Sequence, residues 1–145
     1  MKKFIVVSVF TLISIVAINA QTTTAESVKN VAYKIVFQLT SNDTLVQKAL
    51  VKQIGNALTA APKSKIEVVC HNNGITFLQS AKTQQADKIK ELKAQGVIFA
   101  ACENTLRERK IEKNEIVGEA VFVPSGVIEV VDKQMKKWAY LKAGF

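Results

Sequence analysis

Short apolar runs recur along the chain, separated by longer stretches of mixed polarity. The runs are rich in Val, Ile and Phe and cover residues 33–39, 65–70, 97–101, 119–124 and 139–144. Within them the apolar residues are nearly continuous rather than alternating, which is typical of strands covered on both faces. The pattern therefore predicts five strands, the last of them short.

The stretches between these runs have helical periodicity. One predicted helix follows the polar segment TSNDT, and its apolar residues form a single stripe: Leu45, Val46, Ala49, Leu50, Ile54, Ala57 and Leu58. QADKIKELKAQG predicts a second helix, with Gly96 as its C-terminal cap. NTLRERKI predicts a short third helix, in which Thr105 and Glu108 would form a capping box. SGVIEVVDKQMKKW predicts a fourth, with one apolar side made of Val127, Val130, Val131 and Met135.

Strands that alternate with helices along the chain indicate an α/β fold. We therefore predict a three-layer α/β/α arrangement around a mainly parallel sheet of about five strands. Residues 33–145 are long enough to form one such domain with its own core. No internal repeat or low-complexity tract suggests a second domain.

The first 20 residues, MKKFIVVSVFTLISIVAINA, have the layout of a secretory signal peptide. Two lysines precede an apolar run, and Ala20 precedes a polar segment, which predicts cleavage after Ala20. The run is short for a membrane span, so we expect no stable membrane span after cleavage. Residues 21–32 are polar and small and predict a flexible lead-in. The expected location is the periplasm or the outside of the cell.

The chain is basic, with a formal net charge of +8 that falls to +6 once Lys2 and Lys3 are removed with the signal peptide. A positive charge of this size suits solubility or an anionic partner. The lysines are scattered and no aromatic residues interleave with them, unlike in a nucleic-acid groove. We therefore expect no nucleic-acid partner.

Several polar residues follow directly after predicted strands. In open α/β sheets, ligands bind outside the carboxyl ends of the strands. Cys70, Cys102 and Ser125 come at or just after three such ends and should share one rim. Ser125 and Gly126 begin the last helix, where a hydroxyl and backbone N–H groups could hold an anion. Asn42 and Asp43 follow the first strand as helix caps that could line the same pocket.

Cys102 stands where the third strand passes into a helix, with Asn104 and Thr105 in the first turn. Unpaired N–H groups at a helix start favour a thiolate, which makes such a cysteine a nucleophile or a sulfur carrier. We expect it to be accessible from the rim. The alternative is a buried, inert structural cysteine.

His71 is the single histidine of the chain and follows Cys70. One histidine beside one cysteine does not supply the ligands that a metal site requires, so no metal or other cofactor is expected. We interpret His71 as a turn residue at the rim and include it among the candidate binding residues.

The chain resembles the DsrE/DsrF-like family from about Tyr33 onward. The resemblance rests on KIVFQLTSND, GVIFAACENTL and VPSGVIEVVDKQMKKWAYLKAG, and it is their combination that is specific. It implies an α/β fold, a homotrimer or hexamer, and sulfane sulfur carried as a persulfide on Cys102 and exchanged with a donor or acceptor protein. The cytoplasmic members that serve tRNA thiolation or sulfur oxidation lack a signal peptide, and this difference argues against a tRNA role.

The resemblance also implies that the strands ending at Cys70 and Cys102 are neighbours. Adjacent strands are about 4.8 Å apart, which is within the reach of a disulfide if the side chains face each other. Three functions therefore remain open: a persulfide carrier, a non-catalytic oligomeric module that binds a small anion or a partner protein, and a thiol–disulfide redox protein that uses both cysteines.

Overall fold

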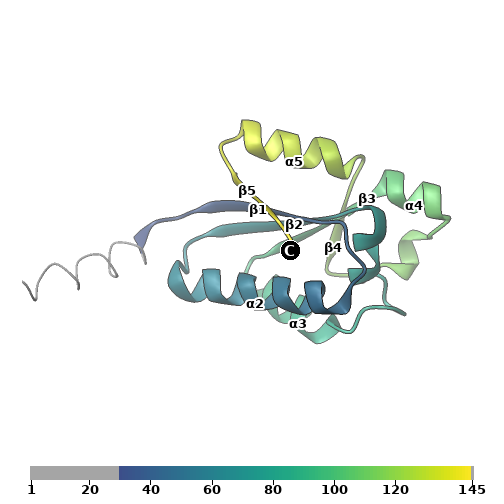
Figure 1. The fold of residues 1–145 in the computed structure, drawn as a ribbon, viewed down its shortest axis with the longest axis horizontal. Coiled ribbons are helices and arrows are strands. Elements are labelled where there is room, and N and C mark those ends of the chain that lie inside the picture. Colours follow the sequence, from purple (N-terminus) through teal and green to yellow (C-terminus); the bar gives the residue numbers. More distant parts are fainter. Residues whose placement is uncertain (1–29, 145) are drawn as a thin grey trace, which may run out of the picture.

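The computed structural model describes residues 30–144 (Figure 1). The expected signal peptide and most of the lead-in lie outside the described residues. The chain from Lys34 onward forms a sheet with helices on both faces, which confirms the predicted α/β/α arrangement.

All strands of the sheet are parallel. Their order across the sheet is β4-β3-β2-β1-β5, so that the chain starts near one edge, moves to the other edge and then returns to pair β5 with β1. The strands are close to their predicted places: β1 Lys34–Leu39, β2 Lys65–Cys70, β3 Ile98–Cys102, β4 Ala120–Val123 and β5 Ala139–Lys142.

Two helices, α2 (Thr44–Ala60) and α3 (Ala86–Ala94), cover one face, and α5 (Gly126–Met135) covers the other (Figure 1). The larger core lies on the α2 and α3 side and includes the contact between the rings of Phe77 and Phe99. The smaller core lies under α5 and consists of Val36, Val69, Ala100, Val123 and Val130. The α5 layer therefore rests on a small apolar contact.

The remaining elements are short and lie near the carboxyl ends of the strands. The 3-10 turn η1 (Asn72–Phe77) follows β2, α4 (Glu103–Arg109) follows β3, and the 3-10 turn η2 (Lys113–Glu115) precedes β4. The Arg109 guanidinium donates to the side-chain oxygens of Asn72 and Asn73 and so ties α4 to η1.

Local sequence signals account for most helix ends. Asp43 caps α2 by accepting from the N–H of Leu45 at 2.7 Å, as predicted. Gly96 follows α3 with a φ of +91°, a left-handed conformation that favours glycine. The predicted capping box of α4 is wrong, because Cys102 holds the N-cap position and Thr105 lies inside the helix.

The apolar side predicted for the last helix is also only partly right. Val130 is buried against the sheet, whereas Val127, Val131 and Met135 are exposed, Met135 by 80%. These side chains, together with Ile128, form an exposed apolar patch on α5, here called the α5 patch. The sequence pattern detected an apolar stripe, but most of it faces away from this chain's own core.

Candidate functional site

The register of the sheet brings His71 and Cys102 together. Cys70 of β2 is the partner of Ala101 of β3, so the next residues outward, His71 and Cys102, are neighbours at the carboxyl edge. Side chains alternate between the two faces of a strand. Ala101 belongs to the larger core and Ala100 to the core under α5, so Cys102 faces α5. His71 faces the same way, because Cys70 belongs to the larger core.

Gly126, the first residue of α5, closes this site from above the sheet. Its N–H donates a hydrogen bond to the Cys102 sulfur at 3.1 Å. A Cβ at Gly126 would lie 3.0 Å from the Cβ of His71 and 3.2 Å from the Cβ of Cys102. The two residues and the helix start are therefore packed so closely that only glycine fits without a shift.

Two opposing effects act on the Cys102 thiol. Burial raises its pKa, but hydrogen bonds to the sulfur together lower it by more, so that the pKa lies below the ordinary value for cysteine. The donors, from largest effect to smallest, are the N–H of Thr105, the N–H of Gly126, the hydroxyl of Thr105 and the N–H of Asn104. The starts of α4 and α5 thus converge on one sulfur atom and favour its thiolate form.

Thr105 and Asn104, which lie in the first turn after Cys102, both belong to this arrangement. The Thr105 hydroxyl also accepts from the N–H of Asn72 at 3.0 Å, which links α4 to the segment after β2. Thr105 is buried, whereas Asn72 is exposed, so this link is partly buried. Thr105 therefore links the Cys102 sulfur to the segment after β2 and does not cap the helix.

The expected accessibility of Cys102 is wrong for the single chain. The residue is only 4% exposed, because α5 lies directly over the end of β3. A donor or acceptor molecule would reach the sulfur only by displacing part of this cover. The site is therefore a polar, covered cysteine and not an open cleft.

Cys70 lies on the opposite side of the sheet. It is fully buried in the larger core, and burial alone raises the pKa of its thiol. Both cysteines are free. A disulfide between them would require one side chain to cross the sheet. Cys70, which was predicted to share the rim with Cys102, therefore does not face the site at Cys102.

The other predicted residues lie just beyond strand ends, and two of them cap helices. Ser125 caps α5 by accepting from the N–H of Ile128 at 3.5 Å. Asp43 caps α2 in the same manner, and Asn42 precedes it beyond the end of β1. For Asp43 and Ser125, these contacts support local capping rather than a shared pocket with Cys102.

Sequence reasoning missed two residues that extend the site toward the edge of the sheet. Gln38 of β1 donates through Nε2 to Nε2 of His71 at 2.8 Å. The hydroxyl of Tyr140 on β5 donates a hydrogen bond to Oε1 of Gln38 at 2.5 Å. Gln38 could have been suspected as the polar residue between Phe37 and Leu39 in an otherwise apolar strand. Tyr140 could not, because its partner is more than 100 residues away.

Among residues 30–144, no group of three or more His, Cys, Asp or Glu side chains could hold a metal ion. Within the same described part of the chain, no helix is long and apolar enough to cross a bilayer.

Comparison with known proteins gives matches to a family and to a solved structure. The sequence model of the DsrE/DsrF-like family matches residues 33–143. The chain is also similar to MTH1491 of Methanobacterium thermoautotrophicum, a protein of unknown function, with 30% sequence identity and a TM-score of 0.73. That similarity covers 76% of this chain and 98% of MTH1491. No curated protein sequence matches the chain.

Proposed function

Because this chain belongs to the DsrE/DsrF-like family, we propose that it carries sulfane sulfur as a persulfide on Cys102. The observation that carries the proposal is the convergence of the starts of α4 and α5 on the Cys102 sulfur, including the 3.1 Å hydrogen bond from Gly126. These donors favour a thiolate, and they can also stabilise the negative charge of a bound sulfur group.

The proposed reaction is a transfer between two thiols and needs no external oxidant. The Cys102 thiolate attacks the outer sulfur of a donor persulfide, R–S–SH. A new S–S bond forms to Cys102 as the S–S bond of the donor breaks, and the donor leaves as the thiolate R–S⁻. The proton stays on the transferred sulfur during the transfer, so atoms and charge balance, and it then passes to water to leave the anionic persulfide Cys102–S–S⁻. An acceptor thiolate reverses the same steps.

A non-catalytic binding module is the second candidate, and the burial of Cys102 favours it. A sulfur that is 4% exposed is poorly placed for attack unless α5 moves. In that case the rim would bind a small anion or a partner protein, and Cys102 would only contribute to packing. The third candidate, a thiol–disulfide protein, is disfavoured because Cys70 and Cys102 face opposite sides of the sheet.

We also propose that the chain works as a homo-oligomer, a trimer or a hexamer. The α5 patch supports this, because it is an exposed apolar surface on the helix that covers the site. A second copy of the chain is the proposed occupant of the patch.

Export to the periplasm or the cell exterior is part of the proposal as well, and it rests on the sequence of residues 1–20. Terminal sequencing of protein from the cell envelope should then begin at Gln21. Recovery of the full-length chain from the cytosol would contradict export.

The direct test of sulfur carrying is the intact mass of the reduced protein after incubation with a persulfide donor. We expect a gain of one sulfur atom, about 32 Da by the added atom's mass, which reducing agent removes. Cys102→Ser should abolish the gain. Cys70→Ser is the matched control and should keep it. If the added sulfur remains in Cys102→Ser, or if the wild-type chain gains none, the binding module takes the place of the sulfur carrier.

A further inference from the structure

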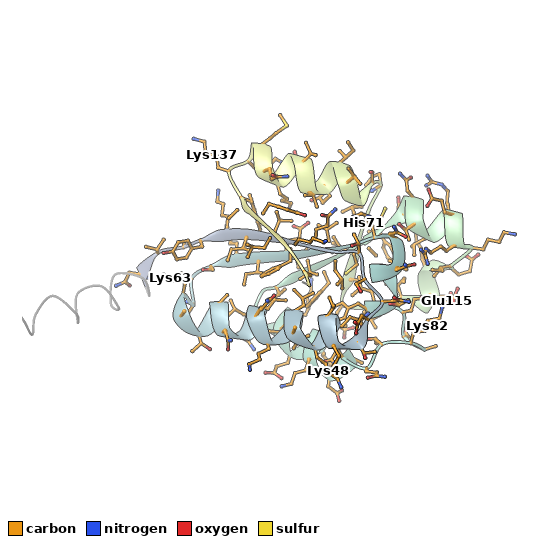
Figure 2. All side chains as sticks on the ribbon, viewed as in Figure 1. Lys48, Lys63, His71, Lys82, Glu115 and Lys137 are labelled. Carbon is orange, nitrogen blue, oxygen red and sulfur yellow. The ribbon has the colours of Figure 1, made fainter. Side chains whose placement is uncertain are left out.

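A continuous chain of hydrogen bonds connects the edge of the sheet to the neighbour of Cys102. It begins at the hydroxyl of Tyr140 on the edge strand β5, passes through the side-chain amide of Gln38 on β1 and ends at His71. His71 is labelled in Figure 2. The three side chains lie on the face of the sheet that α5 covers.

The direction of these bonds determines the tautomer of His71. The Tyr140 hydroxyl donates to Oε1 of Gln38, so the amide NH₂ is the group that faces His71. An amide nitrogen can only donate, so Nε2 of His71 must accept and carries no proton. Burial also lowers the pKa of His71, which favours the neutral ring. A neutral ring without a proton on Nε2 carries its proton on Nδ1.

The end of the His71 ring that carries Nδ1, the Cγ end, lies close to the sulfur site. It is bonded to Cγ, and the Cγ and Cβ of His71 lie 3.2 and 3.0 Å from the position that a Gly126 Cβ would occupy. The Cβ of Cys102 lies 3.2 Å from the same position. In the described part of the chain, Nδ1 has no hydrogen-bond partner of its own, so its proton is available to a group bound on Cys102.

We propose that the Nδ1–H of His71 donates a hydrogen bond to the anionic outer sulfur of a persulfide on Cys102. The inference rests on the sulfur-carrying function proposed above and adds a residue to it. Gln38 and Tyr140 are positioning residues, because they fix the tautomer without touching the sulfur. The site thereby selects a small anionic sulfur group, since a cation would meet only donors from His71, Gly126 and the start of α4.

The tautomer can be measured directly, because His71 is the single histidine of the chain. The ¹⁵N NMR shifts of a histidine-labelled sample at neutral pH should show a protonated Nδ1 and an unprotonated Nε2. Gln38→Leu should remove this preference. Gln47→Leu is the matched control. The Gln47 amide also donates a side-chain hydrogen bond, but its acceptor is the Thr76 hydroxyl and not His71. A proton on Nε2 in the wild-type protein would overturn the proposal and leave sulfur carrying intact.

The hydrogen bond itself is tested by how long the sulfur stays on Cys102. After loading with a persulfide donor and removal of the donor, His71→Leu should lose the added sulfur to a thiol acceptor about tenfold faster than the wild type, as expected for the loss of a hydrogen bond to a charged group. His71→Asn keeps an N–H near the place of Nδ1 and should retain most of the wild-type lifetime.

The outcomes separate the two proposals. If the wild type gains sulfur and His71→Leu keeps that sulfur for as long as the wild type does, the role of His71 is refuted and sulfur carrying stands. If His71→Asn loses sulfur as fast as His71→Leu, the donor role is refuted too. If the wild type gains no sulfur, both proposals fail together.

Discussion

At the scale of single residues, the pKa of the Cys102 thiol depends on the hydrogen-bond donors around it and not on burial alone. Burial raises the pKa of its thiol, and the N–H and hydroxyl donors of two helix starts lower it by more. Cys70 has burial without such donors, and its pKa is raised. The same side chain therefore has opposite properties at positions that end adjacent strands.

This difference predicts unequal reactivity. At pH 7, Cys102 should alkylate faster than Cys70 in the reduced, folded protein, because a larger fraction of it is thiolate. Its rate should rise with pH and level off below the pH at which an unstructured cysteine levels off. Mass mapping of peptides after timed iodoacetamide treatment measures both rates. The prediction would be contradicted if neither cysteine reacted in the folded protein and both reacted at the same rate after denaturation.

Gly126 is the second residue whose identity the site requires. A methyl group in Gly126→Ala would press on His71 and Cys102, both at 3.2 Å or less, and should shift the start of α5 away from the sulfur. We expect a loss of about 1–3 kcal/mol in the free energy of unfolding, as for overpacking, and a higher pKa of the Cys102 thiol. Urea unfolding and the pH profile of alkylation measure these effects.

Gly55→Ala is the matched control for this substitution. A Cβ at Gly55, in the middle of α2, would meet nothing within 4 Å. Alanine is favoured over glycine inside a helix by about 1 kcal/mol, so this variant should be as stable as the wild type or more stable. Equal destabilisation by both alanines would remove the packing explanation.

At the scale of elements, α5 is held on the sheet by a small apolar core and a buried ion pair. Glu67 of β2 is 1% exposed and pairs with Lys133 of α5. Lys133 also contacts the Glu129 carboxylate at 3.3 Å and lies 4.8 Å from the centre of the Trp138 ring. The same helix supplies the Gly126 N–H that donates to the Cys102 sulfur.

Breaking this pair from one side should be costly. Lys133→Met leaves the Glu67 carboxylate buried without its partner, and we expect a loss of about 3 kcal/mol in the free energy of unfolding. The double variant Glu67→Leu, Lys133→Met should recover most of it, because neither charge remains. Lys136→Met on the same helix is the control: its pair with Asp132 is exposed, so the change should stay within about 0.5 kcal/mol. Denaturant unfolding separates the three variants.

The ion pair also predicts a pH dependence of stability. Burial raises the pKa of Glu67 above its ordinary value despite the nearby Lys133. A carboxyl group with a raised pKa in the folded state contributes stability that is present below its unfolded pKa and is lost as the pH rises through its folded pKa. In the weakly acidic range, the free energy of unfolding of the wild-type protein should therefore fall as the pH rises. In Glu67→Gln this fall should be absent. Urea midpoints measured across this range test the sign.

At the scale of the whole molecule, the α5 patch is the feature that the single chain leaves unexplained. Its residues are Val127, Ile128, Val131 and Met135. They lie on the exposed side of α5, the helix that covers Cys102. If a second copy binds there, the particle mass by light scattering should be that of a trimer or hexamer at micromolar concentration. Ile128→Glu should reduce it to one chain, since a buried charge without a partner is strongly unfavourable.

Leu45→Glu is the matched control for the oligomer. Leu45 is similarly exposed but lies on α2, on the other side of the sheet. This variant should keep the wild-type mass. A wild-type particle with the mass of one chain would contradict the proposed assembly.

The sequence by itself determined the α/β fold, the approximate strand positions and the place of Cys102 at a helix start. These features depend on local patterns: continuous apolar runs, helical spacing, and a cysteine where one pattern changes into the other. Capping by Asp43 and the left-handed Gly96 are equally local, because each involves contacts within one turn of the chain.

Only the tertiary structure decided what surrounds Cys102. Strand register placed His71 beside it and put Cys70 on the opposite face, and a shift of one residue would have reversed both results. The Gly126 N–H, the Gln38 amide and the Tyr140 hydroxyl reach the site from other elements. Such contacts depend on how elements pack in space, and no periodicity along a single segment encodes them. The exposure of the α5 patch has the same origin, because an apolar stripe does not specify whether its own chain or another covers it.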